Sequence, residues 1–192
     1  MKKLFIALAF LIFFNSNSFS QSFTRYNFDG SNKCQGLKFS IKYPSNWTKM
    51  DTDSPHIVKK FSIDEKRGLV QMVVYINKSD VTPTQSEIED LYSKDHFLSI
   101  FRVKKVIEYN NQGKVNGERY SYASIQVEDV MNNQTVRSIF RANSMVWKEY
   151  LIQINFAIFS NDQSFETMTK MYNDYNGSFK DIMSSLVINA NQ

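Results

Sequence analysis

The sequence predicts an α+β fold, in which a single antiparallel β-sheet is flanked by helices on its faces. Several segments alternate apolar and polar residues, which is typical of half-buried strands. Two other segments repeat apolar residues every three or four positions, which is typical of amphipathic helices. These two segments do not alternate regularly with the strands, so the order favours an antiparallel sheet over a parallel one.

The first predicted strand covers residues 37–43, where Leu37, Phe39, Ile41 and Tyr43 alternate with polar residues. Pro44 ends this strand because proline cannot donate a hydrogen bond to the sheet. A turn at 44–46 then leads to Trp47. We expect Trp47 to pack beneath the edge of the sheet, and the alternative is an exposed ring that contacts a partner.

The next two predicted strands form a hairpin. Residues 57–63 and 69–76 are joined by a polar loop that ends at Gly68. The second of these strands is apolar on both faces except at Gln71, which indicates a central strand that is covered on both sides.

The second half of the chain predicts four more strands. They cover residues 103–110, 118–130, 135–142 and 146–159, and the last two form a long hairpin that turns about Asn143–Ser144. One face of the last strand is strongly apolar, with Tyr150, Ile152, Ile154, Phe156 and Ile158.

The first predicted helix lies between the strands. Thr84 and Glu87 have the spacing of a capping box, as do Thr82 and Gln85. Apolar residues follow at helical spacing, so we expect one helix that ends at about Ile100.

The second predicted helix covers residues 165–186, where a wide apolar stripe recurs every three or four residues. Gly177 lies within it and is a candidate position for a kink. We expect the stripe to pack into the core.

The N-terminus has the three regions of a secretory signal peptide. Lys2 and Lys3 precede the apolar run 4–14, and Ser18 and Ser20 occupy the small-residue positions before Gln21. The alternative, a membrane anchor, needs ~20 apolar residues. We therefore expect a signal peptide at 1–20 and export to the periplasm or the extracellular space.

The rest of the chain is expected to contain an N-terminal arm at 21–36 and one domain at 37–190. No later segment is apolar enough to be a transmembrane segment of the mature chain. Removal of Lys2 and Lys3 lowers the net charge from +4 to +2, and no dense basic cluster indicates nucleic acid as a partner. Cys34 is the single cysteine, so it is either a free thiol or half of an intermolecular disulfide.

Motifs of catalysis are absent from the sequence. There is no nucleophile elbow, no H-E-x-x-H, no Walker loop and no dinucleotide-binding glycine motif. His56 and His96 are the only histidines, too few with Cys34 for a typical zinc site. We predict no catalytic residues, no cofactor and no metal. His56 is, with Trp47, a candidate contact to a partner, and the alternative is a histidine bonded to backbone in a turn.

Both ends of the predicted domain resemble PsbP-like proteins. The stretch "LKFSIKYPSNWTK" is similar to the strand, Tyr-Pro and Trp that open this domain, and "FETMTKMYNDYNGSFKDIMSSLVI" is similar to its closing helix. The matching residues are Phe39, Tyr43, Pro44, Trp47, Phe179, Met183, Ser185 and Leu186. The likeness spans residues 37–188.

The resemblance implies an α/β/α sandwich of the PsbP and DcrB-like type, in an exported bacterial member. The superfamily includes the extrinsic subunit of the oxygen-evolving complex, a Ran-binding nuclear import factor, and bacterial DcrB-like and type VI secretion adaptor proteins. What these share is that they bind or stabilise other proteins. Fold alone does not fix function, so the photosynthetic role is not transferred.

The expected function is therefore non-enzymatic binding or stabilisation of an envelope or extracellular protein. One alternative is a carrier of a small molecule or lipid, with a pocket between sheet and helix lined by phenylalanine and methionine. A hydrolase whose carboxylates meet only in space is a further alternative.

Overall fold

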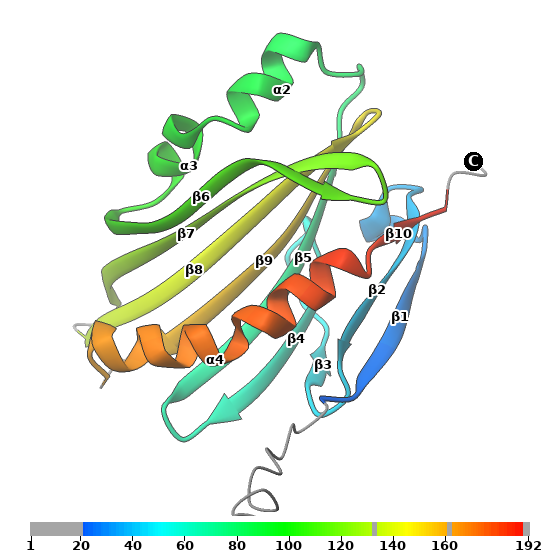
Figure 1. Cartoon of the computed structure of the whole chain (residues 1–192). Helices are drawn as coiled ribbons and strands as arrows, with labels where there is room; N and C mark the ends of the chain where they lie inside the picture. Colours follow the sequence, from blue (N-terminus) through cyan, green and yellow to red (C-terminus); the bar gives the residue numbers. More distant parts are fainter. Residues whose placement is uncertain (1–20, 132–133, 161–162, 190–192) are drawn as a thin grey trace, which may run out of the picture.

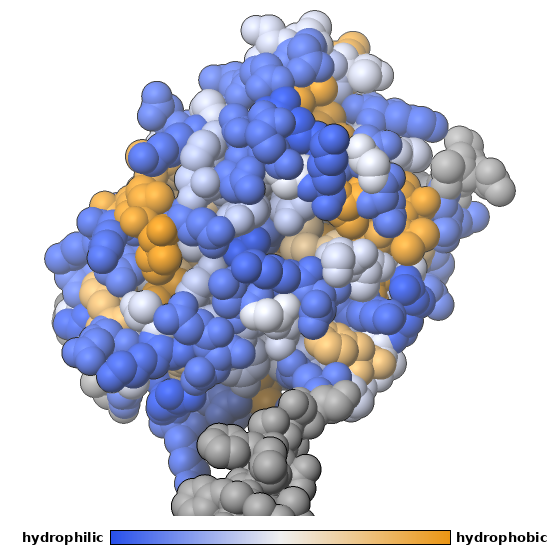
Figure 2. Space-filling view, in the orientation of Figure 1, coloured by the Kyte–Doolittle hydropathy of each residue, from blue (hydrophilic) through white to orange (hydrophobic). Residues whose placement is uncertain are grey.

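The computed structural model describes residues 21–131, 134–160 and 163–189, and the predicted signal peptide lies outside them. Within these residues the chain forms two antiparallel sheets and three α-helices (Figure 1). The face shown in Figure 2 is mainly hydrophilic and carries a few compact apolar areas.

The larger sheet has seven strands, and every neighbouring pair is antiparallel. In spatial order they are β3 (Thr48–Met50), β4 (Ile57–Glu65), β5 (Gly68–Lys78), β9 (Tyr150–Ser160), β8 (Gln134–Trp147), β7 (Glu118–Met131) and β6 (Val103–Val115).

The smaller sheet has three strands, β1 (Phe23–Asp29), β2 (Lys38–Pro44) and β10 (Val187–Ile188), with β2 in the middle. A 3-10 turn, η1 (Asn32–Cys34), joins β1 to β2. The prediction of a single sheet flanked by helices is therefore wrong: the protein is mostly β, with two sheets. Two features at the ends of β2 explain why this strand belongs to a separate sheet. Residues before it provide the partner strand β1, and Pro44 ends it before the chain enters the large sheet at β3.

The predicted helix at 84–100 is divided into α2 (Gln85–Leu91) and α3 (Lys94–Ile100). Ser93 breaks it, because its side chain accepts a hydrogen bond from the His96 N–H at 3.0 Å and so caps a new helix. The capping box of Thr84 and Glu87 is confirmed. The last helix, α4 (Phe165–Ser184), continues through Gly177, which faces open space.

The predicted turn at Asn143–Ser144 is also wrong, because β8 continues to Trp147 and the chain turns at Lys148 and Glu149. Asn143 is buried in the sheet instead. Its side-chain amide donates to the Ile154 carbonyl at 2.6 Å, and its backbone N–H donates to the Asn155 side chain at 3.1 Å. The sequence predicted Asn143 in a turn because it is polar. In the sheet, its polar groups form hydrogen bonds with the neighbouring strand β9 instead.

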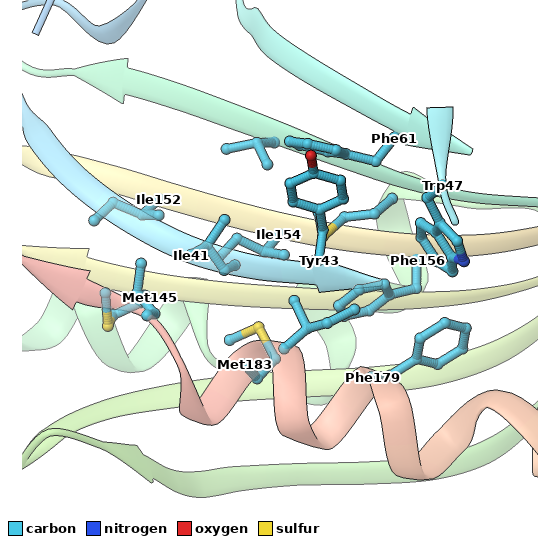
Figure 3. Close-up of a cluster of buried hydrophobic side chains, with 14 of the residues drawn as sticks. Ile41, Tyr43, Trp47, Phe61, Met145, Ile152, Ile154, Phe156, Phe179 and Met183 are labelled. Carbon is cyan, nitrogen blue, oxygen red and sulfur yellow. The ribbon is translucent and has the colours of Figure 1, made fainter. Parts of the chain in front are cut away.

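The core lies between the large sheet on one side and α4 with the small sheet on the other (Figure 3). The predicted apolar face of β9 is confirmed, since its members all belong to this core. Phe156 of β9 stacks on Phe179 of α4 with ring centroids 4.4 Å apart. Ile41 and Tyr43 of β2 complete the layer.

A buried cation joins α4 to the same face of the large sheet. Arg141 of β8 is 1% exposed and lies 3.8 Å from the Tyr122 ring centroid. It donates to the Asn176 side chain of α4 at 3.1 Å, and it forms an ion pair with Glu108 at 3.6 Å. The Tyr172 hydroxyl of α4 lies 3.4 Å from its guanidinium. These contacts fix α4 over β8.

The helix α3 covers the opposite face of the large sheet. Ser124 of β7 bonds to Tyr172 of α4, and successive residues of a strand point to opposite faces. Ala123 and Ile125 therefore point away from α4, and they pack with Phe97 of α3 in a second apolar cluster.

Candidate functional site: the groove beside α2

Trp47, the first of the two residues predicted to contact a partner, lies in the core. Its side chain is 4% exposed, with its ring centroid 6.2 Å from that of Tyr175 on α4 (Figure 3). The indole Nε1 is buried and has no hydrogen-bond partner among the described residues. The ring thus packs beneath the turn that follows β2, in the position that the sequence favoured, and a partner at the surface does not reach it.

His56, the second predicted contact, is exposed in the turn before β4. Its backbone carbonyl accepts a hydrogen bond from the Ile76 N–H at 3.4 Å. Trp47 precedes β3 at the other end of β4, about 20 Å away along the strand. The structure therefore does not bring the two residues into one site.

A groove lies between α2 and the ends of β5, β8 and β9. It has a volume of about 460 Å³. Five of its lining residues are apolar and three are acidic. The apolar ones are Val81, Pro83, Leu91, Val146 and Leu151, and the acidic ones are Glu87, Asp90 and Glu149. Asn77, Ser79 and Ser86 complete the lining.

The groove exists because α2 does not pack closely on the sheet. None of the seven residues of this helix is buried. Ser86, Glu87, Asp90 and Leu91 share the helix face that lines the groove. No residue of the lining is buried, and Val81 is 71% exposed. The groove is therefore open along its length.

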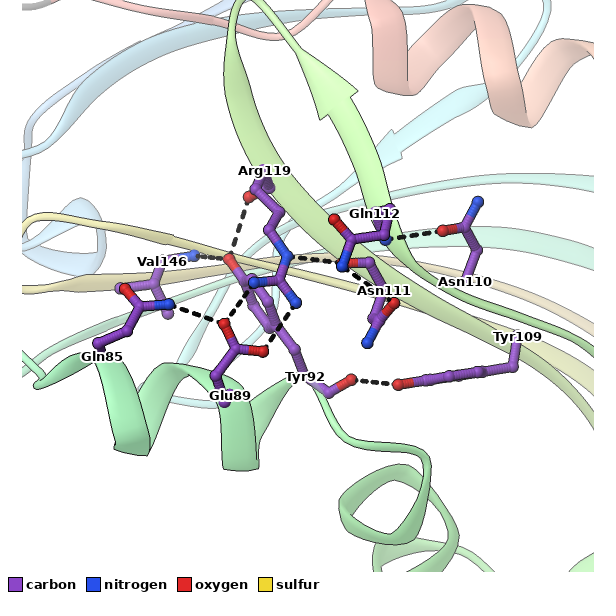
Figure 4. Close-up of polar contacts among 9 residues, drawn as sticks. All are labelled: Gln85, Glu89, Tyr92, Tyr109, Asn110, Asn111, Gln112, Arg119 and Val146. Carbon is purple, nitrogen blue, oxygen red and sulfur yellow. Dashed lines mark hydrogen bonds and ion pairs between the residues drawn. The ribbon is translucent and has the colours of Figure 1, made fainter.

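Polar contacts hold the other face of α2 and its C-terminal end (Figure 4). The guanidinium of Arg119 binds both carboxylate oxygens of Glu89, at 2.5 and 2.9 Å. Tyr92 is 1% exposed; its hydroxyl donates to the Arg119 carbonyl at 3.0 Å and accepts from the Val146 N–H at 2.7 Å. Tyr109 donates to the Tyr92 carbonyl at 2.5 Å. These bonds attach α2 to the large sheet without filling the groove.

Hydrogen bonds and burial also set the protonation states of the ionisable groups around α2. The hydrogen bond from Arg119 lowers the pKa of Glu89, and burial raises the pKa of the Tyr92 hydroxyl. Hydrogen bonds from the backbone and side chain of Thr84 lower the pKa of Glu87. Both carboxylates are therefore ionised at neutral pH, and Tyr92 keeps its proton.

A second groove, of about 280 Å³, lies between the tip of the β6–β7 hairpin and β10. Its lining is mainly apolar and includes Val115, Met145, Trp147, Leu186, Val187 and Ile188. Figure 2 shows apolar surface in this region, on the right of the view beside β10. It carries one acidic residue, Glu118, so its charge differs from that of the α2 groove.

The described residues hold no group of three or more His, Cys, Asp or Glu side chains that could bind a metal ion. None of the helices that the structure describes is long and apolar enough to cross a membrane. Cys34 is buried as a free thiol, and burial raises its pKa to about 11.

The sequence analysis missed the α2 groove, although one signal for it was present. Residues 79–93 contain four acidic residues and no basic one, in a chain of net charge +4. The apolar half of the lining had no such signal, because Val146 and Leu151 come from strands that are distant in sequence from α2.

Comparison with known proteins finds distant likenesses among solved structures. No protein-family model matches the chain, and no curated protein matches it. The fold is similar to that of LpqN from Mycobacterium tuberculosis, described as involved in cell envelope biogenesis, with 10% identity, a TM-score of 0.49, and coverage of 86% of this chain and 91% of LpqN. A crystal structure from Bacteroides thetaiotaomicron VPI-5482 is similar over 87% of this chain, with 11% identity and a TM-score of 0.43. The matched part is 48% of that protein.

Both TM-scores lie below 0.5, so neither likeness defines a family or a function. The resemblance to PsbP-like proteins stays a prediction. The fold and the site together define a small β-rich domain that carries an open, acidic-edged groove.

Proposed function

We propose that the protein is an exported, non-enzymatic domain that binds a protein partner in the cell envelope or outside the cell, and that the α2 groove is its binding site. The observation that carries the proposal is the openness of this groove. Its eleven lining residues all remain accessible, and its apolar side chains come from three separate parts of the chain. Accessible apolar surface next to polar groups is the usual character of a site for a protein segment.

A carrier of a small molecule is less well supported. Sites for small molecules bury about 70–90% of the ligand surface. No residue that lines this groove is itself buried, so the groove lies at the surface between α2 and the strand ends and is less suited to enclose a small ligand. The predicted pocket between sheet and helix would need the methionines of α4, but Met168, Met171 and Met183 are at most 3% exposed and pack in the core. Those side chains stabilise the fold and are not free to line a pocket.

The proposal is tested by purifying the tagged protein from its own cells after mild crosslinking, with a groove variant for comparison. Val81→Asn changes the most exposed apolar residue of the groove, and its exposure means that folding does not depend on it. Val130→Asn is the matched control, since Val130 is 66% exposed and lies on β7, outside the groove.

We expect one envelope or extracellular protein to be enriched with the wild type and with Val130→Asn, and to be depleted with Val81→Asn. Equal recovery with Val81→Asn would show that the groove is not the site. If no protein is enriched and native mass spectrometry finds a bound small molecule, the carrier hypothesis replaces this one.

A further inference from the structure

The chemistry of the partner can be inferred from the charges around the α2 groove. Residues 79–93 carry Asp80, Glu87, Glu89 and Asp90 without a lysine or arginine, while the chain without the predicted signal peptide has a net charge of +2. Glu149 adds a carboxylate from the turn between β8 and β9. The groove is therefore the acidic part of a basic protein.

Three basic residues near the groove contact groups outside the groove face of α2. Arg119 binds Glu89 on the face of α2 that points away from the groove. Lys78 lies 3.8 Å from the Glu149 carboxylate. Lys148 lies 4.5 Å from the centroid of the Trp147 ring. None of these cations compensates the groove face of α2.

Two carboxylates on that face have no cationic partner among the described residues. Within the described part of the chain, Glu87 accepts side-chain hydrogen bonds only from Thr84, at 2.7 Å from the backbone and 2.8 Å from the side chain. Asp90 follows one turn later on the same face, three residues along α2, and its side chain has no bond to a described residue. A cation in the groove would approach both charges together.

The apolar side chains lie directly beside these charges. Leu91 is next to Asp90 in α2, and Leu151 and Val146 form an antiparallel pair on β9 and β8. All three are half-buried, so each has apolar surface left to cover. An apolar side chain placed there is stabilised because its apolar surface and that of the groove are both removed from water.

We propose that the α2 groove binds a segment of the partner protein in which lysine or arginine residues stand next to apolar residues. The apolar side chains pack on Val81, Leu91 and Leu151, and the cation lies between Glu87 and Asp90. This inference rests on the proposed function and specifies its partner. Acidic segments are repelled by the same carboxylates, so the charges select against them as well as for basic ones.

The probe for this inference is a random twelve-residue peptide library displayed on phage, selected on the immobilised protein. Binders that also bind Val81→Asn are removed, so that only groove-dependent peptides are sequenced. Their affinities are then measured at low and at high salt for three proteins: wild type, Asp90→Lys, and Asp53→Lys. Asp53 is an exposed aspartate in the loop before β4, outside the groove, so it is a matched control for charge reversal.

We expect the selected peptides to be enriched in lysine or arginine beside apolar residues. Their affinity should fall about tenfold with Asp90→Lys, stay unchanged with Asp53→Lys, and weaken as salt rises. Groove-dependent peptides that are neutral or acidic would overturn the inference while leaving the proposed function intact. Equal binding to Asp90→Lys would overturn it too. If no selected peptide depends on Val81, both the inference and the groove as the binding site are wrong.

Discussion

Removal of the Trp47 side chain should strongly destabilise the fold. The ring is 4% exposed and packs beside Tyr175 of α4, so Trp47→Ala empties a large site between the turn after β2 and the helix. Emptied aromatic core sites cost about 3–5 kcal/mol of unfolding free energy. A domain of this size loses about 2–4 °C in melting temperature for each kcal/mol, so we expect a decrease of roughly 6–20 °C.

Trp47→Phe separates the packing of the ring from its polar atom. The indole Nε1 is buried without a partner among the described residues, and an unsatisfied buried donor costs about 1–3 kcal/mol. Phenylalanine loses part of the apolar contact but also removes this donor. The two effects oppose each other, so we expect the free energy of unfolding to change by less than about 1.5 kcal/mol.

Both variants are compared with wild type by urea unfolding, followed by circular dichroism because the fluorescence of Trp47 is lost. We expect wild type and Trp47→Phe to unfold at similar urea concentrations, and Trp47→Ala to unfold at a clearly lower one. A midpoint for Trp47→Ala equal to that of wild type would refute the structural role of this residue. Loss of partner recovery in a Trp47→Ala protein of unchanged stability would instead place the ring at an interface.

Three further predictions concern other buried groups. Tyr92→Phe leaves the part-buried Val146 N–H without its acceptor, so it should cost about 1–2 kcal/mol and speed amide hydrogen exchange in α2. Tyr120→Phe is the matched control, because the Tyr120 hydroxyl has no bond to a described residue, and it should do neither. Arg141→Met keeps most of the volume of the buried side chain, so thermal unfolding should find it more stable than Arg141→Ala by about 1–2 kcal/mol, and equal stabilities would contradict the packing of this residue. Because burial raises the pKa of Cys34 to about 11, the unfolded thiol ionises first as pH rises; stability should therefore fall by roughly 2–3 kcal/mol between about pH 9 and pH 11, and Cys34→Ala should lack this part of the decrease.

Local patterns predicted much of the fold. The alternation in β2 and β9, the capping box at Thr84 and the stripe of α4 each depend on residues close in sequence, and all four are found in the structure. Each depends on a periodicity or a hydrogen bond within a few residues, which a single sequence displays directly.

The errors came from contacts between distant residues. Residues 21–36 had no clear strand pattern, so the pairing of β1 with β2, and with it the second sheet, was not predicted. Asn143 was predicted in a turn because it is polar. Its hydrogen bonds to Ile154 and Asn155 form only after β8 has paired with β9, so a single sequence does not display them. Ser93 divided the first helix by capping α3, although apolar spacing continued across it.

The candidate site was hidden for the same reason. Its acidic residues are close together in sequence, but Leu151 and Val146 join them only after β8 and β9 have paired. The acidic side of the groove could therefore be recognised from the sequence, whereas its apolar side could not.

The most direct test of the α2 groove is photo-crosslinking in the native cell. A photo-reactive amino acid is placed at position 81, at the edge of the groove, and at position 130 as a control of similar exposure. We predict that position 81 crosslinks to a single protein, at a segment with lysine or arginine beside apolar residues, and that position 130 does not. Crosslinks from position 130 alone, or an absence of crosslinks from position 81, would contradict the assignment of this groove as the binding site.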